Sequence, residues 1–366
     1  MKQRNNKTIV LTAGGTGGHI YPAEALAVEL DRRGFEVIFY TDERGLGNYQ
    51  GKLSQLEIKT ISSGSVIGKS IKTKILSLIK VGLGILQAVI NLIIKRPRAV
   101  VGFGGYASFP TCVAAIILRI PLIIHEQNSV MSRTNRLLAP FARWCAQSFN
   151  HVKNTPQTAR TFLCGMPVRE NIITLHQQDR TPWDKKQKFN LLILGGSQGA
   201  HIFSEVVPQA ISLLPPDYRN QLFIYQQCRK DDEGLVTSAY QNLGVSANVA
   251  SFFNNMPELY QKSQLMISRS GASSVYEITA SGIPSILVPL PTAADNHQYY
   301  NAKELADAKG AILIEQKDFE AQELSALLQK IMEDNSIWQN LSNNAKHCAI
   351  IDAQIRLAEK IEAIRG

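Results

Sequence analysis

Residues 9–19 read IVLTAGGTGGH and residues 191–201 read LLILGGSQGAH, and these two stretches decide the fold. Each begins with aliphatic and β-branched residues, continues through a glycine-rich turn and ends at a histidine. A buried strand followed by a glycine turn and a helix is typical of a parallel sheet with helices on both faces. Because the pattern occurs in both halves of the chain, it predicts two doubly wound α/β domains.

The rest of the chain continues this alternation of strands and helices. Strands are expected at residues 7–13, 36–41, 99–104, 121–126, 144–149, 189–196, 221–227, 248–253, 264–270, 284–290 and 311–316. The polar stretch 165–188 has weak periodicity and is interpreted as a linker. The expected domains are therefore residues 1–168 and 169–345, with a last helix at about 346–366 that packs back on the first domain.

Composition limits the class of protein. The chain has 366 residues, of which 45% are apolar and 19% charged, which is typical of a globular protein with two domains. Five scattered cysteines without paired spacing indicate buried thiols in a reducing cytoplasm. The short apolar run near the N-terminus is not a signal peptide.

Charge is distributed unevenly along the chain. Residues 1–170 contain 22 Lys and Arg against 9 Asp and Glu, whereas residues 171–366 contain 17 against 21. The basic first half is expected to face an anionic partner, unless the asymmetry is ordinary surface scatter. A lipid surface is favoured over nucleic acid, because aromatic residues do not alternate with the basic ones.

Residues 75–94 form an apolar run of 20 residues that is long enough to cross a bilayer. Polar or small residues recur along it every three or four positions and draw one narrow stripe on a helix. Three interpretations stay open: a core helix, a helix at a membrane surface, or a true membrane span. The residues expected to face the membrane are Lys72, Lys74, Ile75, Leu78, Lys80 and Ile85.

Three glycine turns follow strands, at residues 13–19, 102–106 and 195–200. Backbone N–H groups in such turns can approach a phosphate closely. None of the turns is a Walker A loop or a GxGxxG fingerprint, so a phosphorylated ligand other than a dinucleotide is favoured over simple tight corners. A further anion site is expected where small hydroxyl residues begin a helix at 268–282, with Glu277 either on a ribose diol or complementing the helix dipole.

Two polar clusters also follow strands. Residues 125–136 place His, Glu, Gln and Asn at the end of a strand, and residues 294–302 place Asp, Asn, His and Gln at a helix start. Such residues line a site or belong to solvated loops and helix caps. The chain has no Asp-x-Asp triplet and no histidine pattern with zinc spacing, so metal-independent chemistry without a cofactor is expected.

Seven motifs occur in an order that resembles the MurG family of UDP-N-acetylglucosamine transferases. The motifs are GGTGGHIYPAEALA (14–27), GFGGYASFP (102–110), HEQNSVMSRTNRLLA (125–139), GMPVR (165–169), GGSQGA (195–200), SRSGASSVYEITASGIPSILVPLP (268–291) and DNHQYYNA (295–302). The resemblance implies a GT-B fold, in which two Rossmann-like domains face a central cleft. It implies an acceptor- and membrane-facing first domain and a second domain that binds the UDP-sugar.

The resemblance also implies site residues. Those expected to be catalytic are His19, Tyr106 and Glu126, with His19 as the candidate base. Those expected to bind the substrates are Thr16, Gly17, Gly18, Asn128, Arg169, Ser197, Phe253, Ala272, Ser273, Ser274, Val275, Tyr276, Glu277, His297 and Gln298. Met166 stands where the family commonly has Asn, and Phe253 stands where it commonly has Ile.

The implied reaction moves N-acetylglucosamine from UDP-GlcNAc to the C4 hydroxyl of the N-acetylmuramyl unit of lipid I, with inversion, and gives lipid II and UDP. Such an enzyme is expected at the cytoplasmic face of the inner membrane, peripherally bound to anionic lipid, with cell-wall and division proteins as further partners and no nucleic acid. A UDP-GlcNAc 2-epimerase of the same fold is the alternative enzyme. A nicotinamide-dependent oxidoreductase and a non-catalytic nucleotide-binding regulator are weaker interpretations.

Overall fold

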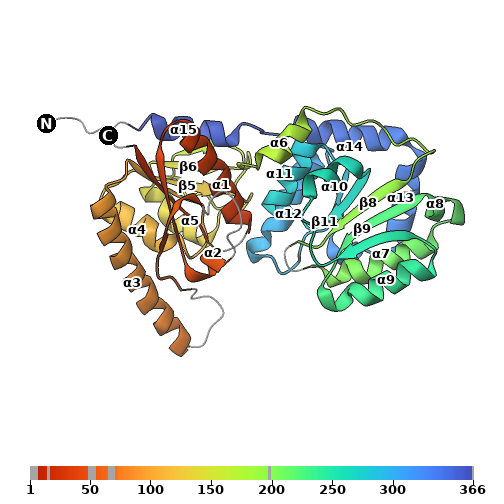
Figure 1. Cartoon of the computed structure of the whole chain (residues 1–366), viewed down its shortest axis with the longest axis horizontal. Helices are drawn as coiled ribbons and strands as arrows, with labels where there is room; N and C mark the ends of the chain where they lie inside the picture. Colours follow the sequence, from red (N-terminus) through yellow and green to blue (C-terminus); the bar gives the residue numbers. More distant parts are fainter. Residues whose placement is uncertain (1–6, 15–16, 48–54, 65–70, 197–198, 365–366) are drawn as a thin grey trace. The chain divides into compact units, whose positions relative to one another are not determined.

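The structure is a computed structural model, and it describes residues 7–14, 17–47, 55–64, 71–196 and 199–364. The chain divides into two compact units (Figure 1). Unit 1 comprises Met1–Arg169 and Ile351–Gly366, and unit 2 comprises Glu170–Ile350.

Unit 1 is built on one parallel sheet. Among the described residues its strands lie in the order β3-β2-β1-β4-β5-β6-β7. Their bounds are β1 (Thr8–Thr12), β2 (Glu36–Thr41), β3 (Glu57–Thr60), β4 (Ala99–Gly102), β5 (Leu122–Glu126), β6 (Trp144–Gln147) and β7 (Thr161–Leu163). The helices of this unit are α1 (Gly17–Arg32), α2 (Glu43–Gly47), α3 (Ile71–Lys95), α4 (Phe109–Ile117), α5 (Arg133–Leu138), η2 (Ala139–Phe141) and α15 (Ala353–Glu362).

Unit 2 repeats the arrangement, with the strand order β10-β9-β8-β11-β12-β13 in the part of the chain that is described. The strands are β8 (Phe189–Leu194), β9 (Leu222–Gln227), β10 (Ser246–Ala250), β11 (Leu265–Ser268), β12 (Ser285–Leu287) and β13 (Ile312–Leu313). The α-helices are α6 (Glu170–His176), α7 (His201–Leu213), α8 (Pro216–Gln221), α9 (Glu233–Asn242), α10 (Met256–Lys262), α11 (Ala272–Ser281), α12 (His297–Asp307), α13 (Ala321–Glu333) and α14 (Asn335–His347). The 3₁₀ turns are η3 (Lys230–Asp232), η4 (Ala294–Asn296) and η5 (Gln316–Asp318).

The predicted pair of parallel α/β sheets is confirmed, and every expected strand forms. In each sheet the order reverses beside the first strand, β1 or β8, because the chain fills one side of that strand before it crosses to the other. Ligands of doubly wound sheets bind beyond the carboxyl ends of the strands at this point. The glycine turns after β1 and β8 lie there.

The polar stretch 165–188, interpreted as a linker, contains the boundary between the two units, at Arg169–Glu170, and it is folded. Met166 is 2% exposed, and α6 forms within the stretch. Trp183 lies edge-to-face on Phe189, with ring centroids 5.2 Å apart. Met166 and Trp183 are therefore buried, although the apolar residues of this stretch are spaced too irregularly to predict a helix or a strand.

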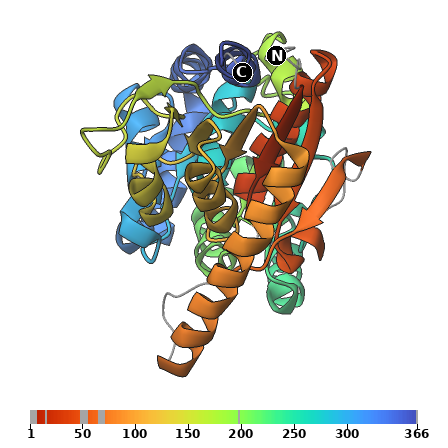
Figure 2. The same cartoon turned by 90° about the vertical axis from the view of Figure 1, so that its left-hand side faces the viewer.

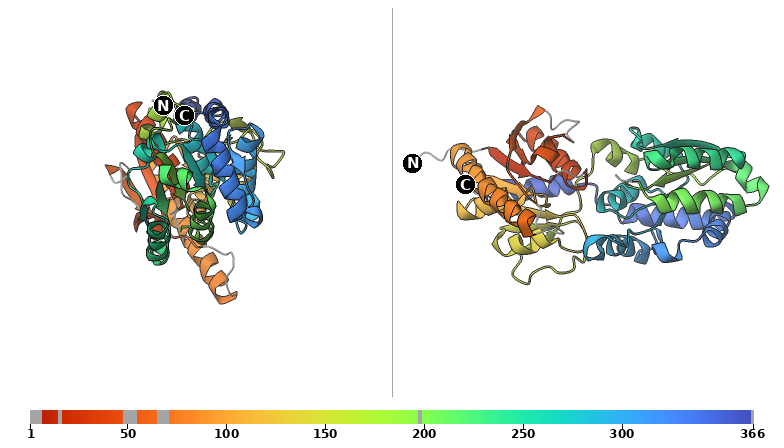
Figure 3. Two further views of the ribbon diagram at one scale, coloured as in Figure 1. Left: turned by 90° about the vertical axis from the view of Figure 1, so that its right-hand side faces the viewer. Right: turned by 90° about the horizontal axis from the view of Figure 1, so that it is seen from below.

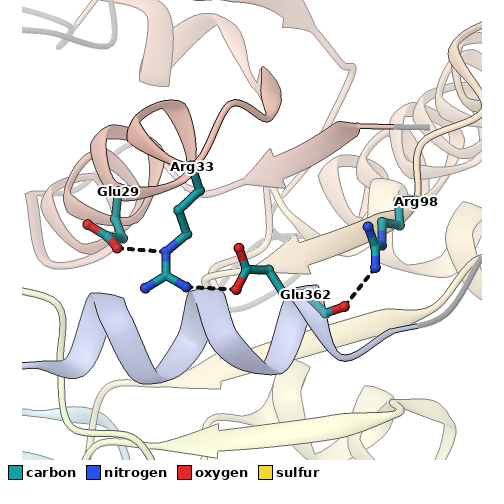
Figure 4. Close-up of polar contacts among 4 residues, drawn as sticks. All are labelled: Glu29, Arg33, Arg98 and Glu362. Carbon is teal, nitrogen blue, oxygen red and sulfur yellow. Dashed lines mark hydrogen bonds and ion pairs between the residues drawn. The ribbon is translucent and has the colours of Figure 1, made fainter. Parts of the chain in front are cut away.

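The C-terminal helix α15 belongs to unit 1, where it packs against α1. Arg33 joins Glu29 of its own helix to Glu362 of α15, with N–O distances of 2.7 and 2.8 Å (Figure 4). Arg98 donates to the backbone carbonyls of Ile364 and Glu362, at 2.8 and 2.7 Å. A guanidinium at these last carbonyls satisfies acceptors that a helix end leaves open.

Helix α3 is the most exposed apolar element of unit 1. Its first turns project away from the sheet in three views (Figures 1, 2 and 3). The most apolar 18-residue window within Thr73–Lys95 has a mean hydropathy of 2.0, and 22% of that window is buried; by length and composition alone, this helix could cross a membrane.

Part of the polar and small stripe of α3 faces the protein: Ser77 and Gly84 are buried, whereas Lys80 and Gln87 are exposed. A Cβ on Gly84 would lie 1.9 Å from the carbonyl oxygen of Ser62, and Gln87 Oε1 accepts from the Ser62 backbone N–H at 2.9 Å. Lys95 pairs with Glu57 at 2.6 Å. Most of the apolar side chains of α3 are exposed, so the interpretation of this helix as a core helix is wrong.

The residues expected to face a membrane differ in their exposure. Ile75 is 54% and Leu78 60% exposed, and Lys74 and Lys80 are also exposed. Ile85 is half-buried. The side chain of Lys72 lies outside the described residues.

Candidate functional site

The candidate site of unit 1 lies at the carboxyl ends of β1, β4 and β5, which are neighbours in the sheet. A Cβ on Gly105 would lie 3.4 Å from Gly14 Cα and 3.5 Å from His19 Cδ2, so the turns after β1 and β4 are in contact. Gly104 and Gly105 have φ angles of +80° and +76°, which favour glycine. His19, in the first turn of α1, therefore lies directly against the Gly104–Gly105 turn.

Gly17 permits a close contact at the start of α1. A Cβ there would lie 2.9 Å from Tyr21 Cε2. The guanidinium carbon of Arg169 lies 4.6 Å from the centroid of the Tyr21 ring, which is a cation–π distance. Arg169 is thus held beside the first turn of α1. Thr16 lies outside the described residues.

Glu126, at the end of β5, is fully buried. One carboxylate oxygen accepts from the backbone N–H and the side-chain amide of Asn128, at 3.1 and 3.4 Å. The other accepts from the backbone N–H of Ser132 at 2.9 Å and from Asn135 Nδ2 at 2.8 Å. Burial raises the pKa of Glu126, and these hydrogen bonds oppose that rise. The carboxylate therefore organises the loop that carries Asn128.

His125 is the second buried titratable group of this segment. Its Nε2 lies 2.9 Å from the Gly165 carbonyl oxygen, so Nε2 carries the proton. Its ring centroid lies 5.4 Å from that of Phe103. Burial lowers the pKa of His125 to about 4, which keeps the ring neutral at physiological pH.

The lowered pKa of His125 predicts a loss of stability in acid. The unfolded chain, with an ordinary histidine pKa of about 6.5, binds a proton that the folded state rejects, so the free energy of unfolding falls as the pH drops from 6.5 towards 4. Between pH 7 and pH 5 the loss from this group is about 2 kcal/mol. We expect His125→Gln to remove that part of the pH dependence in urea unfolding, whereas His347→Gln, an exposed control, keeps it. An identical pH slope in wild type and His125→Gln would contradict this reading.

Tyr106 follows the Gly104–Gly105 turn and is 39% exposed. Its hydroxyl accepts a hydrogen bond from Arg44 Nη1 at 3.3 Å. Tyr106, His19 and Asn128 thus come from the segments that follow β4, β1 and β5, at the same edge of the sheet.

The candidate site of unit 2 begins with the turn after β8. A Cβ on Gly195 would lie 2.2 Å from the Ala200 backbone nitrogen, so no other residue fits there. Gly196 and Gly199 have φ angles of +79° and +68°. Ser197 lies outside the described residues.

Only one face of the first turns of α11 is accessible to solvent. Ser273, Ser274 and Glu277 are half-buried, whereas Ala272, Val275 and Tyr276 are buried. The latter three can therefore serve a ligand only through backbone groups, and the Val275 N–H is already bonded to the Gly271 carbonyl at 3.1 Å. Tyr260 donates its hydroxyl proton to Glu277 Oε2 at 2.7 Å, which orients that carboxylate.

The loop before α12 is strained. Asp295 and Asn296 have φ angles of +51° and +54°, in the left-handed region that favours glycine. His297 Nδ1 lies 2.8 Å from the Ala294 carbonyl oxygen, so Nδ1 is protonated and Nε2 is an acceptor in the neutral ring. Gln298 Oε1 accepts from the Leu290 N–H at 3.0 Å, which leaves its amide N–H groups to face a ligand.

Phe253 follows β10 and is 8% exposed, so its side chain is packed inside unit 2 and only its backbone can read a ligand. Its neighbour Phe252 is 63% exposed. In the described part of the chain no group of three His, Cys, Asp or Glu side chains could hold a metal ion.

Sequence reasoning missed several residues that shape these sites, among them Arg44, Tyr21, Asn135 and Tyr260. Each contacts a predicted site residue, and only Asn135 does so from the same motif as its partner, Glu126. Tyr21 and Asn135 lie within the motifs 14–27 and 125–139 without being singled out there, whereas no local pattern marks Tyr260, and Arg44 is marked only by its place shortly after an expected strand.

Two parallel α/β units, each with a glycine turn at the carboxyl edge of its sheet, are the arrangement of the GT-B fold. The sequence matches the glycosyltransferase family 28 N-terminal domain over residues 9–147 and the family 28 C-terminal domain over residues 190–356. The chain belongs to glycosyltransferase family 28, within the MurG group to which the relatives below belong.

The relatives match over nearly their whole length. A protein of Rhodospirillum rubrum named UDP-N-acetylglucosamine–N-acetylmuramyl-(pentapeptide) pyrophosphoryl-undecaprenol N-acetylglucosamine transferase is 43% identical, over 97% of this chain and 91% of its own. A protein of Zymomonas mobilis with the same name is 39% identical, over 99% and 93%.

Two solved structures illustrate the fold. MurG of Acinetobacter baumannii superposes with a TM-score of 0.78 at 28% identity, over 97% of this chain and 99% of its own. The UDP-GlcNAc 2-epimerase of Neisseria meningitidis has a TM-score of 0.67 at 15% identity, over 97% and 99%, and shares the fold alone.

Proposed function

We propose that this enzyme transfers N-acetylglucosamine from UDP-GlcNAc to the C4 hydroxyl of the N-acetylmuramyl unit of lipid I, giving lipid II and UDP. The observation that carries the proposal is the 43% identity to a transferase of that name over 97% of the chain. Unit 1 then binds the acceptor and unit 2 binds the UDP-sugar.

On the acceptor side, His19 is the general base. A sugar hydroxyl becomes a competent nucleophile when a base removes its proton, and an imidazole suits this task near neutral pH. In-line attack on the anomeric carbon breaks its bond to the UDP oxygen and inverts the configuration from α to β. The contact between His19 and the Gly104–Gly105 turn, with Tyr106 following that turn, supports a site at this edge.

Glu126 is a positioning residue rather than a group that touches the substrate. Its burial and its hydrogen bonds to the loop after β5 support this role. Asn128, which that loop carries, then contacts the transferred sugar.

On the donor side, the open face of α11 binds the nucleotide. The first-turn N–H groups of Ala272, Ser273 and Ser274 and the two serine hydroxyls serve the diphosphate. Glu277, one turn further on and oriented by Tyr260, accepts from the ribose hydroxyls. Helix dipole and hydroxyl groups would neutralise the leaving UDP without a metal ion.

The remaining donor contacts come from loops. Arg169 and Ser197 contact the nucleotide, the Phe253 backbone reads the uracil, and His297 and Gln298 bind the sugar hydroxyls. The tautomer of His297 supports the last assignment, since its Nε2 can accept from a hydroxyl.

The test is release of UDP from UDP-GlcNAc in the presence and absence of a soluble lipid I analogue. We expect UDP only with the acceptor, together with a disaccharide product. UDP-N-acetylmannosamine formed without acceptor would instead identify a 2-epimerase, and binding without turnover would identify a nucleotide-binding regulator.

We further propose that the enzyme binds peripherally to the cytoplasmic face of the cell membrane. Residues on the outer face of α3 are apolar and more than half exposed, namely Ile75, Leu76, Leu78, Ile79, Leu83, Leu86, Ile90, Ile93 and Ile94. Lys74 and Lys80 lie on the same helix, and the first half of the chain is basic, which favours anionic lipid.

The double substitution Ile79→Glu with Leu83→Glu tests this surface. We expect binding to anionic vesicles to fall more than about tenfold. Two aliphatic side chains that would enter the bilayer are lost, and two carboxylates repel the anionic lipid. Leu213→Glu with Leu235→Glu, at exposed leucines of unit 2, is the matched control. Unchanged vesicle binding, or a rise in the KM for UDP-GlcNAc alone, would refute the membrane role of α3.

A further inference from the structure

Arg180 follows α6 in unit 2 and lies outside the seven motifs of the sequence. Its guanidinium reaches the C-terminal end of α10, where Nη1 donates to the backbone carbonyl oxygen of Tyr260 at 2.8 Å and Nη2 donates to that of Ser263. The last carbonyls of a helix have no partner within it, and a cation there also complements the helix dipole. Arg180 therefore caps α10.

The cap matters for the position of α10 because this helix is short. It has seven residues, and a helix of about two turns is not stable by itself in water. Its C-terminal end is also tied to β8, where Asn190 Nδ2 donates to the Lys262 carbonyl oxygen at 3.0 Å. Helix α6 packs against both α10 and α11 (Figure 1). The place of α10 in unit 2 therefore depends on contacts from other segments, and Arg180 supplies two of them.

Tyr260 connects the capped end of α10 to the candidate nucleotide site. The residue is 1% exposed. Its backbone carbonyl accepts from Arg180, and its hydroxyl donates to Glu277 Oε2 at 2.7 Å. One buried residue thus joins the Arg180 guanidinium to the Glu277 carboxylate, so a shift of α10 would move that carboxylate.

The charge of Arg180 serves this cap rather than an ion pair. Within the described ranges Arg180 has no carboxylate partner, and its Nε is buried without a hydrogen bond. Burial lowers the pKa of Arg180 to about 10, so the guanidinium stays protonated at neutral pH. Its planar fork donates to two carbonyls at once, and the single ammonium group of a lysine does not reproduce that geometry.

We propose that Arg180 is a positioning residue for the donor nucleotide: by capping α10 it holds Tyr260, and through Tyr260 it holds the Glu277 carboxylate in place for the ribose. The inference rests on the proposed function, in which Glu277 accepts from the ribose hydroxyls. A carboxylate oxygen accepts more than one hydrogen bond, so Glu277 can keep its bond to Tyr260 while it binds the ribose. The expected consequence is a preference for ribose over 2′-deoxyribose that depends on Arg180.

The experiment measures the binding of UDP and of 2′-deoxy-UDP to the full chain by titration calorimetry, which needs no acceptor. We expect wild type to bind UDP about tenfold more tightly, as one hydrogen bond to a charged group provides. Arg180→Lys keeps a cation at the end of α10 but loses the forked donors, so it should weaken UDP more than 2′-deoxy-UDP. Arg219→Lys, at a half-buried arginine of α8 before β9, is the matched control and should keep the wild-type preference.

Tyr260→Phe separates positioning of the carboxylate from support of the fold. It removes the hydroxyl that orients Glu277 but keeps the buried ring and the capped carbonyl. We expect it to lose the ribose preference as well, and Arg180→Lys should cause no further loss in the Tyr260→Phe background.

The inference is overturned if either single variant keeps the wild-type preference, if Arg180→Lys weakens both nucleotides equally, or if the losses of the two variants add. Equal binding of the two nucleotides by wild type would remove the ribose role of Glu277 and this inference with it. Wild type that binds neither nucleotide would instead refute the proposed function itself.

Discussion

His19→Ala should lower kcat by about 10²–10⁴-fold, since that is the contribution of a positioned general base. The imidazole lies against the Gly104–Gly105 turn in unit 1, at the edge where we propose that the acceptor binds. Because the base acts on the acceptor, the KM for UDP-GlcNAc should change little. Steady-state UDP release with saturating acceptor measures the effect.

The control for this prediction is His347→Ala, which removes an exposed histidine of unit 2. It should leave kcat unchanged, and both variants should unfold at the wild-type urea concentration. Near-normal turnover of His19→Ala would rule out the base assignment and return His19 to a role in positioning its loop.

Glu126→Gln should destabilise unit 1 by about 4 kcal/mol and abolish most of the activity. Each carboxylate oxygen accepts two hydrogen bonds from buried or half-buried donors. A glutamine amide has only one oxygen, so its NH₂ group would face two donors, at a cost of about 1–3 kcal/mol for each unmet group. The loop that carries Asn128 would shift as a result. Urea unfolding and UDP release measure the two effects.

Glu359→Gln, at an exposed glutamate of α15, is the matched substitution and should be neutral. If Glu126→Gln were as stable as wild type but inactive, the carboxylate would contact the substrate directly. If it were both stable and active, the hydrogen-bond arrangement at the end of β5 would be unnecessary.

The strands at the edges of the first sheet show where sequence-based prediction of the fold ended. β3 and β7, with the sequences EIKT and TFL, were not expected. Both are short, and most of their residues are exposed or half-buried, so neither has the apolar run that marks a central strand. They are strands because β2 and β6 offer open edges for pairing.

Glu126 shows what the sequence could not predict about the candidate site. The motif HEQN predicts polar residues at the end of a strand, and β5 does end at Glu126. The sequence does not indicate that Asn128, Ser132 and Asn135 all turn towards the carboxylate, because this depends on the path of the loop and on α5. Its burial and four hydrogen bonds are the reason we propose a positioning role for this carboxylate.

The amino-acid sequence by itself determined the two parallel sheets and the edge at which each site lies. Strand periodicity and glycine turns are local properties, and a parallel sheet places the carboxyl ends of its strands at one edge. The tertiary structure decided which face of α3 packs, how deeply Glu126 is buried and that Arg44 meets Tyr106. Those features depend on contacts between residues far apart in the chain. Gly84, for example, lets the backbone of α3 approach the carbonyl oxygen of Ser62 so closely that no side chain fits between them.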